Sequence, residues 1–125
     1  MKLTRILSLS LVIIALTSCN GGVYRLSDFG IYPNTGEDMT LKIANVIETI
    51  QIEQKGEPAT LLFDEGDYDF YPENGIEREY YISNHDQDNP KKVALVLENI
   101  SNLTIDGQGA NLYMNGRMLP VAMVG

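Results

Sequence analysis

Three aspartates in the stretch FDEGDYDF are the first residues whose type and spacing invite a chemical interpretation. Asp64, Asp67 and Asp69 supply carboxylate oxygens, which are ligands that Ca²⁺ prefers. Their spacing, however, does not match the D-x-[DN]-x-[DN]-G pattern of a calcium-binding loop. A solvated turn is the better explanation of DEGD, because Asp and Gly are typical turn residues. We therefore predict no metal at these residues.

Cys19 is the only cysteine of the chain, and the residues before it follow the order of a secretory signal peptide. Lys2 and Arg5 precede an apolar core, Ile6–Leu16, which is shorter than the roughly 20 residues that a membrane-spanning helix needs. The sequence LTSC after this core resembles a bacterial lipobox, in which the cysteine thiol receives a diacylglycerol and the freed amine a further acyl chain. Several acyl chains give stable anchoring where one would be marginal.

These features predict a lipoprotein signal peptide over residues 1–18 and a lipidated tether over residues 19–22. The expected location is the cell envelope, with the chain lipid-anchored to a membrane. The NGG that follows Cys19 contains no acidic run, so the sequence leaves open whether the chain faces the periplasm or the cell surface. The alternative is that Cys19 is an ordinary small residue near a signal-peptidase site.

The charge balance limits the possible partners. The chain has 125 residues, with nine Lys and Arg against seventeen Asp and Glu, and a net charge of −8. This length allows one domain at most. Nucleic-acid binding requires a basic surface that neutralises phosphates, so we predict no nucleic-acid partner. With one cysteine there is no disulfide framework, and stability must come from a packed core.

One helix is predicted, over the sequence MTLKIANVIETIQIEQKG, because its apolar residues recur at helical spacing. Asp38 is its expected N-cap. Short strands are predicted at VYRLSDFG and at residues 61–63, 68–70 and 80–82. The apolar face of the helix consists of Met39, Ile43, Val46, Ile47 and Ile50.

Three short apolar runs follow, at residues 93–97, 103–105 and 112–114, and they are separated by corners rich in Asn and Gly. Val93-Ala94 recurs 28 residues later as Val121-Ala122. Three strands per unit, joined by such corners, are typical of one coil of a parallel β-helix, whereas a meander would show regular hairpin turns. Asn suits these corners because it tolerates the left-handed conformation.

A solenoid needs roughly three or more repeats to bury a continuous core. The sequence supplies about one coil, so we expect that the 125 residues are the front of a longer protein. Residues 23–125 are then an N-terminal cap and the first coil of the β-helix.

The order of parts resembles the N-terminal portion of the right-handed parallel β-helix carbohydrate enzymes. The segments that carry this resemblance are YRLSDFGIYPNTGEDMT, the helix, ATLLFDEGDYDF and NLTIDGQGANL. The resemblance implies an all-β fold of the pectate-lyase-like, right-handed parallel β-helix type, with one capping α-helix.

A narrower resemblance covers Tyr80–Met123. SNHDQ, then VALVLENISNLTIDGQG and GRMLP, are similar to glycoside hydrolase family 110, the exo-acting α-1,3-galactosidases. Membership would imply removal of terminal α-1,3-linked galactose, as on blood-group-B-type glycans, with inversion at the anomeric carbon and without a cofactor. The expected partner is then a glycan with a terminal α-linked galactose.

Inversion requires one carboxylic acid and one carboxylate, held roughly 6.5–9.5 Å apart on opposite sides of the sugar. The matched region offers Asp86, Asp88, Glu98 and Asp106. Asp106 has a turn explanation, Glu98 ends a strand, and so short a chain has too few coils to present the pair. We therefore assign no catalytic residue to this chain and expect the catalytic carboxylates beyond Gly125.

Four residues are candidates for substrate binding under this resemblance: Asn84, His85, Asp86 and Arg117. The first three would reach a sugar hydroxyl near the cleft, although a lone His in a polar turn is usually solvated. The guanidinium of Arg117 would bond galactose hydroxyls, or its stem would cover an apolar edge. Tyr113 is expected to point away from the core.

Two other functions remain open for the same fold, because fold alone does not determine function. The first is a non-catalytic β-helix lipoprotein that binds glycan or serves as a surface scaffold. The second is a polysaccharide lyase, which would need a basic residue and often calcium, and nothing in the sequence points to either.

Overall fold

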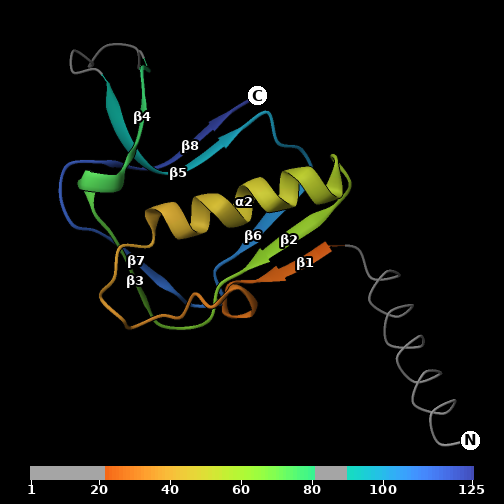
Figure 1. Cartoon of the computed structure of the whole chain (residues 1–125), viewed down its shortest axis with the longest axis horizontal. Coiled ribbons are helices and arrows are strands. Elements are labelled where there is room, and N and C mark those ends of the chain that lie inside the picture. The colour runs from red at the N-terminus through yellow and green to blue at the C-terminus, as the bar shows by residue number, and fades with distance from the viewer. Residues whose placement is uncertain (1–21, 81–89) are drawn as a thin grey trace, which may run out of the picture.

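The computed structural model describes residues 22–80 and 90–125. This part of the chain is mostly strands with one α-helix, α2, which confirms the predicted all-β composition (Figure 1). Within it, no helix has the length and apolarity needed to cross a bilayer. The elements are β1 (Gly22–Arg25), η1 (Leu26–Phe29), α2 (Thr40–Gln54), β2 (Ala59–Leu62), β3 (Asp67–Phe70), η2 (Pro72–Asn74), β4 (Ile76–Arg78), β5 (Lys91–Glu98), β6 (Leu103–Asp106), β7 (Asn111–Met114) and β8 (Leu119–Val124).

The strands form three small sheets, in the orders β1-β2-β6, β3-β7 and β4-β5-β8. Strands β2, β3 and β5 each lie in a different sheet. The next three strands, β6, β7 and β8, join the same three sheets in the same order. Each returning strand pairs in parallel with its predecessor, whereas β4 pairs antiparallel with β5. Figure 1 shows β1, β2 and β6 lying side by side, and β5 beside β8.

The pairing register corrects the predicted repeat. Val121 lies opposite Leu95 and Ala122 opposite Val96, so β8 repeats β5 after 26 residues and not after 28. A slip of two residues leaves every side chain on the same face of a strand, so hydrophobic pattern alone does not distinguish the two registers. The other two sheets repeat after 44 residues, as in Ala59 opposite Leu103, because η2 and β4 lie between β3 and β5.

One predicted strand differs from the structure. The run VYRLSDFG is a strand only as far as Arg25; Leu26–Phe29 then forms a 3₁₀ turn that ends at Gly30, whose φ is 75°. The backbone there follows a turn that local propensity does not specify. Of the strand predicted at residues 80–82, only Tyr80 lies in the described part, where it follows β4 and is not in a strand; residues 81 and 82 lie outside it.

Helix α2 packs one face on the sheets, and the predicted face is correct. Ile43, Val46, Ile47 and Ile50 are all buried. At the start of the helix, Asp38 accepts hydrogen bonds from the backbone N–H and the hydroxyl of Thr40, at 3.0 and 2.6 Å. The helix begins at Thr40 with Met39 at the N-cap position, so the predicted N-cap at Asp38 is wrong by one residue. The carboxylate of Asp38 nevertheless satisfies a free N–H at the start of the helix, as a capping side chain does.

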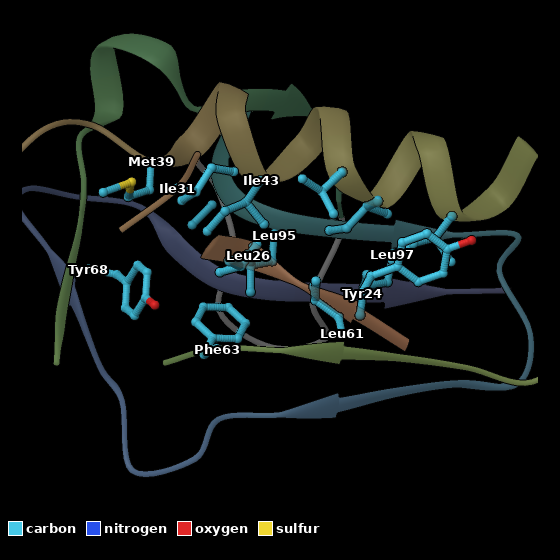
Figure 2. Packing of buried hydrophobic residues seen from close by; sticks show 14 of the residues in the cluster. Tyr24, Leu26, Ile31, Met39, Ile43, Leu61, Phe63, Tyr68, Leu95 and Leu97 are labelled. Carbon is cyan, nitrogen blue, oxygen red and sulfur yellow. The ribbon is translucent and has the colours of Figure 1, made fainter. Parts of the chain in front are cut away.

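The core lies between α2 and the inner faces of the sheets, as Figure 2 shows. The Phe63 and Tyr68 rings meet edge to face with their centroids 5.1 Å apart. The Tyr68 hydroxyl oxygen accepts a hydrogen bond from the backbone N–H of Asp64 at 3.0 Å. At the other end of the core, the Tyr24 hydroxyl donates to Glu53 at 2.8 Å. Both tyrosines thus bury their rings while their hydroxyls keep partners.

The Asp38 carboxylate should make the stability of the chain depend on pH. Burial raises the pKa of Asp38, but hydrogen bonds from Thr40, Asn74 and Tyr71 favour the charged form and hold its pKa below the ordinary value. A carboxyl whose pKa is lowered by folding stabilises the protein above its unfolded pKa, and this stabilisation disappears as the pH falls through the folded pKa.

We expect Asp38→Ala to lower the free energy of unfolding at pH 7 by about 1–2 kcal/mol, as other helix caps do. Thermal unfolding from pH 7 to pH 3 should show the gap between the parent chain and the variant narrowing in acid. Asp28→Ala, at an exposed carboxylate, is the control and should leave stability within about 0.5 kcal/mol. A gap that does not change with pH would contradict the assignment.

Candidate functional site

Most of the predicted site residues lie outside the described part of the chain. Cys19 precedes Gly22, and Asn84, His85 and Asp86 fall within residues 81–89, so their roles stay predictions. Arg117 lies in the exposed turn between β7 and β8, and its predicted contact with sugar hydroxyls stays untested.

Tyr113 does point away from the core. Its side chain is 48% exposed, and it lies in register with Asp69, which faces outward on β3. Leu112 and Met114, its neighbours on β7, pair with the fully buried Tyr68 and Phe70. The alternation of β7 is therefore as predicted.

The three aspartates do not gather around one point. The Asp64 carboxylate forms an ion pair with Arg25, with 2.9 Å between Asp64 Oδ1 and Arg25 Nη1. Asp67 lies at the start of strand β3 and not in the predicted turn, whereas Asp69 lies in the strand as predicted. Their carboxylates accept hydrogen bonds from Asn111 and Asn115, at 3.1 and 2.9 Å. These two bonds link successive passes of the chain on the outer face of one sheet. Across residues 22–80 and 90–125, no three His, Cys, Asp or Glu side chains come together as a metal site would require.

A group of polar residues lies on the outer side of the β4–β5 pair. Glu98, at the end of β5, accepts a hydrogen bond from Arg78 Nε at 2.9 Å and one from the Tyr80 hydroxyl at 3.1 Å, one on each carboxylate oxygen. Sequence reasoning missed this group because Arg78 and Tyr80 are 20 and 18 residues away from Glu98, and no local pattern signals a contact over such a separation. Tyr80 directly precedes the segment that holds Asn84, His85 and Asp86, so the group marks where that segment begins.

The electrostatics of this group decide what Glu98 can do. The hydrogen bond from Arg78 lowers the pKa of Glu98, and the weaker effect of burial does not reverse this. Burial, together with the Glu98 carboxylate, raises the pKa of the Tyr80 hydroxyl. Glu98 is thus held ionised, which suits an acceptor or a base but not a general acid, since an acid must keep its proton near neutral pH.

Two surface hollows of the described part lack the pair of carboxylates that inversion needs. A hollow of about 350 Å³ lies at the C-terminal end of α2, and its lining includes Gln51, Gln54, Lys55 and one carboxylate, Glu57. Another, of about 290 Å³, lies between β6 and β8 and is lined mainly by aliphatic side chains. Neither has the two facing carboxylates that inversion needs.

Comparison with known proteins gives a consistent set of relatives, whereas no protein-family model matches the chain. The chain is 46% identical over 125 residues to "Alpha-1,3-galactosidase B" of Phocaeicola vulgatus, an alignment that covers 99% of this chain and 21% of that protein. It is 46% identical over 103 residues to "Alpha-1,3-galactosidase B" of Bacteroides fragilis, covering 82% of this chain and 17% of the relative. "Alpha-1,3-galactosidase A" of Shewanella woodyi is 38% identical over 96 residues, covering 77% and 15%. The chain thus spans about a fifth of the length of these relatives.

Proposed function

Because the chain is homologous to part of the α-1,3-galactosidases, we propose that it forms the N-terminal part of a glycoside hydrolase that releases terminal α-1,3-linked galactose. The observation that carries this proposal is the extent of the similarity, which runs over nearly the whole chain and so includes α2 and all three sheets. The substrate class that we propose is blood-group-B-type glycans, and the reaction proceeds with inversion at the anomeric carbon.

The role proposed for this chain is structural support at the start of a right-handed parallel β-helix. Two observations support this fold. Strands β2, β3 and β5 lie in three different sheets, and β6, β7 and β8 pair with them in parallel, in the same order. Helix α2 then covers the first end of the coil, and its buried face closes the core there. We place the catalytic acid and base in the rest of the longer protein, because inversion needs two facing carboxylates and the two hollows described above do not hold such a pair.

We also propose that lipid attached to Cys19 holds the protein to a membrane of the cell envelope. Strand β1 begins at Gly22, so only Asn20 and Gly21 lie between the lipidated residue and the folded part. The extended chain from Cys19 to Gly22 spans roughly 10 Å. The end of the molecule where β1 begins therefore lies close to the membrane surface.

A chimaera tests the proposed activity directly. Residues 22–125 replace the matching part of the Phocaeicola vulgatus relative, and proton NMR follows the sugar released from an α-1,3-linked galactose substrate. We expect galactose to be released, with the β-anomer appearing first, because water attacks the face opposite the leaving group. The relative without its matching part is the control and should be inactive.

The outcomes of this test separate the alternatives. A folded chimaera that binds glycan but cleaves none would contradict the hydrolase proposal and favour a scaffold or binding role. Release of the α-anomer first would contradict inversion, since a retaining mechanism keeps the configuration of the substrate.

A further inference from the structure

The hollow at the C-terminal end of α2 is a site that the proposed hydrolysis does not use. It has a volume of about 350 Å³ and lies where the end of the helix meets the connection between β5 and β6 (Figure 1). Part of its lining is apolar, since Ile50 and Ala59 are buried and Ile100 is half-buried. Polar side chains also line it, those of Gln51, Gln54, Lys55, Glu57, Asn99 and Ser101. Such a mixed lining fits a ligand that has both apolar and polar surface.

Hydrogen bonds hold the two walls of this hollow together. At the end of α2, the backbone N–H of Lys55 donates to the C=O of Gln51 at 3.2 Å, and Lys55 adopts the left-handed conformation. The side-chain amide of Asn102, in the connection between β5 and β6, donates to the C=O of Gly56 at 2.7 Å. The hollow is therefore formed before a ligand arrives, and binding costs little conformational entropy.

Two glutamine side chains are fixed so that their oxygens stay available. Gln51 Nε2 donates to the backbone C=O of Glu98 at 3.1 Å, and Gln54 Nε2 donates to the Tyr24 hydroxyl at 2.7 Å. Each amide is thus oriented by its nitrogen, and its carbonyl oxygen can still accept a hydrogen bond from a ligand.

The other polar side chains of the lining have no protein partner. In the part of the chain that the structure describes, no hydrogen bond or ion pair engages the side chains of Lys55, Glu57, Asn99 or Ser101. Together they offer an ammonium, a carboxylate, an amide and a hydroxyl, which include both donors and acceptors. A ligand with several hydroxyl groups can bond to all of them, because a hydroxyl both donates and accepts.

The charges of the hollow favour a neutral ligand. Lys55 and Glu57 contribute one charge of each sign. The C-terminal end of a helix carries a partial negative charge, which opposes a phosphate or a carboxylate. The single carboxylate of the lining also argues against a divalent metal ion, for which the described residues offer no cluster of ligands.

We infer that this hollow is a non-catalytic binding site for one or two neutral sugar units of a glycan. The hydroxyls of the sugar bond to the Gln51 and Gln54 oxygens and to Asn99 and Ser101, while its C–H groups contact the apolar lining. The site binds without cleaving, because it lacks the two facing carboxylates that inversion needs. The inference comes from the lining alone and does not rest on the proposed hydrolysis.

Binding of lactose to the chimaera tests this inference. Lactose is neutral and has no α-galactosidic bond, so the proposed hydrolase does not cleave it. We expect saturation-transfer NMR to detect binding with a Kd on the order of 1 mM, and Ser101→Trp, which fills the hollow, to weaken it by about tenfold or more. Thr104→Trp, at an exposed position of β6 outside the lining, is the matched control and should change the Kd by less than about twofold.

Asn99→Gly is a second variant, in case Ser101→Trp does not fold. Asn99 has a φ of 55°, which glycine adopts readily, so this change removes the side-chain amide and keeps the backbone. It should weaken lactose binding by about threefold to tenfold, the usual effect of one lost hydrogen bond. Gln108→Gly, at a φ of 51° in the corner before β7, is its control and should leave the Kd unchanged.

The outcomes decide between a sugar site and the alternatives. No lactose binding to the parent chimaera, or unchanged binding in both hollow variants, would overturn the inference. Galacturonate that binds more tightly than lactose and is lost in Ser101→Trp would identify an anion site, and the inference would be wrong. None of these results requires the release of galactose, so the inference and the proposed function fail separately.

Discussion

Replacing Phe63 with alanine should lower the free energy of unfolding by about 3–5 kcal/mol, the usual cost of deleting a buried aromatic ring. Phe63 is 1% exposed, and its ring meets that of Tyr68 edge to face at one end of the core (Figure 2). The surrounding residues come from α2 and all three sheets, so they cannot collapse into the cavity without shifting several elements. Since domains are stable by only about 5–15 kcal/mol, the variant should be folded marginally at 25 °C.

Urea denaturation followed by circular dichroism measures this loss, on the 125-residue chain or on the chimaera. Phe29→Ala is the matched control, because it removes the same ring from a position that is 42% exposed. We expect the control to cost less than about 1 kcal/mol, part of it from the stacking of Phe29 on Tyr24. Similar losses of unfolding free energy in the two variants would show that Phe63 is not a core residue.

Replacing Cys19 with serine should abolish membrane attachment. Without the thiol no diacylglycerol can be transferred, and the protein then loses several acyl chains at about 0.8 kcal/mol per buried methylene. Partition into a detergent phase and intact mass measure the effect: the parent protein should enter the detergent phase with the added mass of lipid, and Cys19→Ser should do neither.

Ser18→Ala is the matched control for the anchor, since it keeps a small residue before the cysteine and leaves the thiol in place. We expect the control to retain the lipid mass and its detergent partition. A parent protein that is soluble and starts at another residue would contradict lipid attachment at Cys19.

Local patterns in the sequence determined the helix and the faces of the strands. The apolar spacing from Ile43 to Ile50 predicted the buried face of α2, because the period of 3.6 residues places such side chains on one side. The short alternating runs likewise predicted β3, β6 and β7, whose inward sides are those expected. These features depend only on neighbours along the chain, which is why the sequence alone was sufficient for them.

The candidate site was predictable only in part. Cys19 was singled out by its place after the apolar core of the signal peptide, and residues 84–86 and Arg117 by the sequences SNHDQ and GRMLP that carry the family resemblance. All of these roles remain predictions. The contacts of Glu98 with Arg78 and Tyr80 came from the structure, because these residues are 20 and 18 positions away from Glu98 in the sequence. Local patterns relate only residues that are close in the sequence, so they do not predict contacts between residues as far apart as these.

Tertiary structure alone decided how successive passes of the chain stack. It placed Leu95 against Val121, at a repeat of 26 residues in place of 28, and buried Leu95. It also separated Asp64 from Asp67 and Asp69 and gave each carboxylate its own partner. The physical reason is that the hydrophobic pattern fixes which face of a strand is buried, whereas slips of two residues preserve that face, so the register is set only by long-range packing.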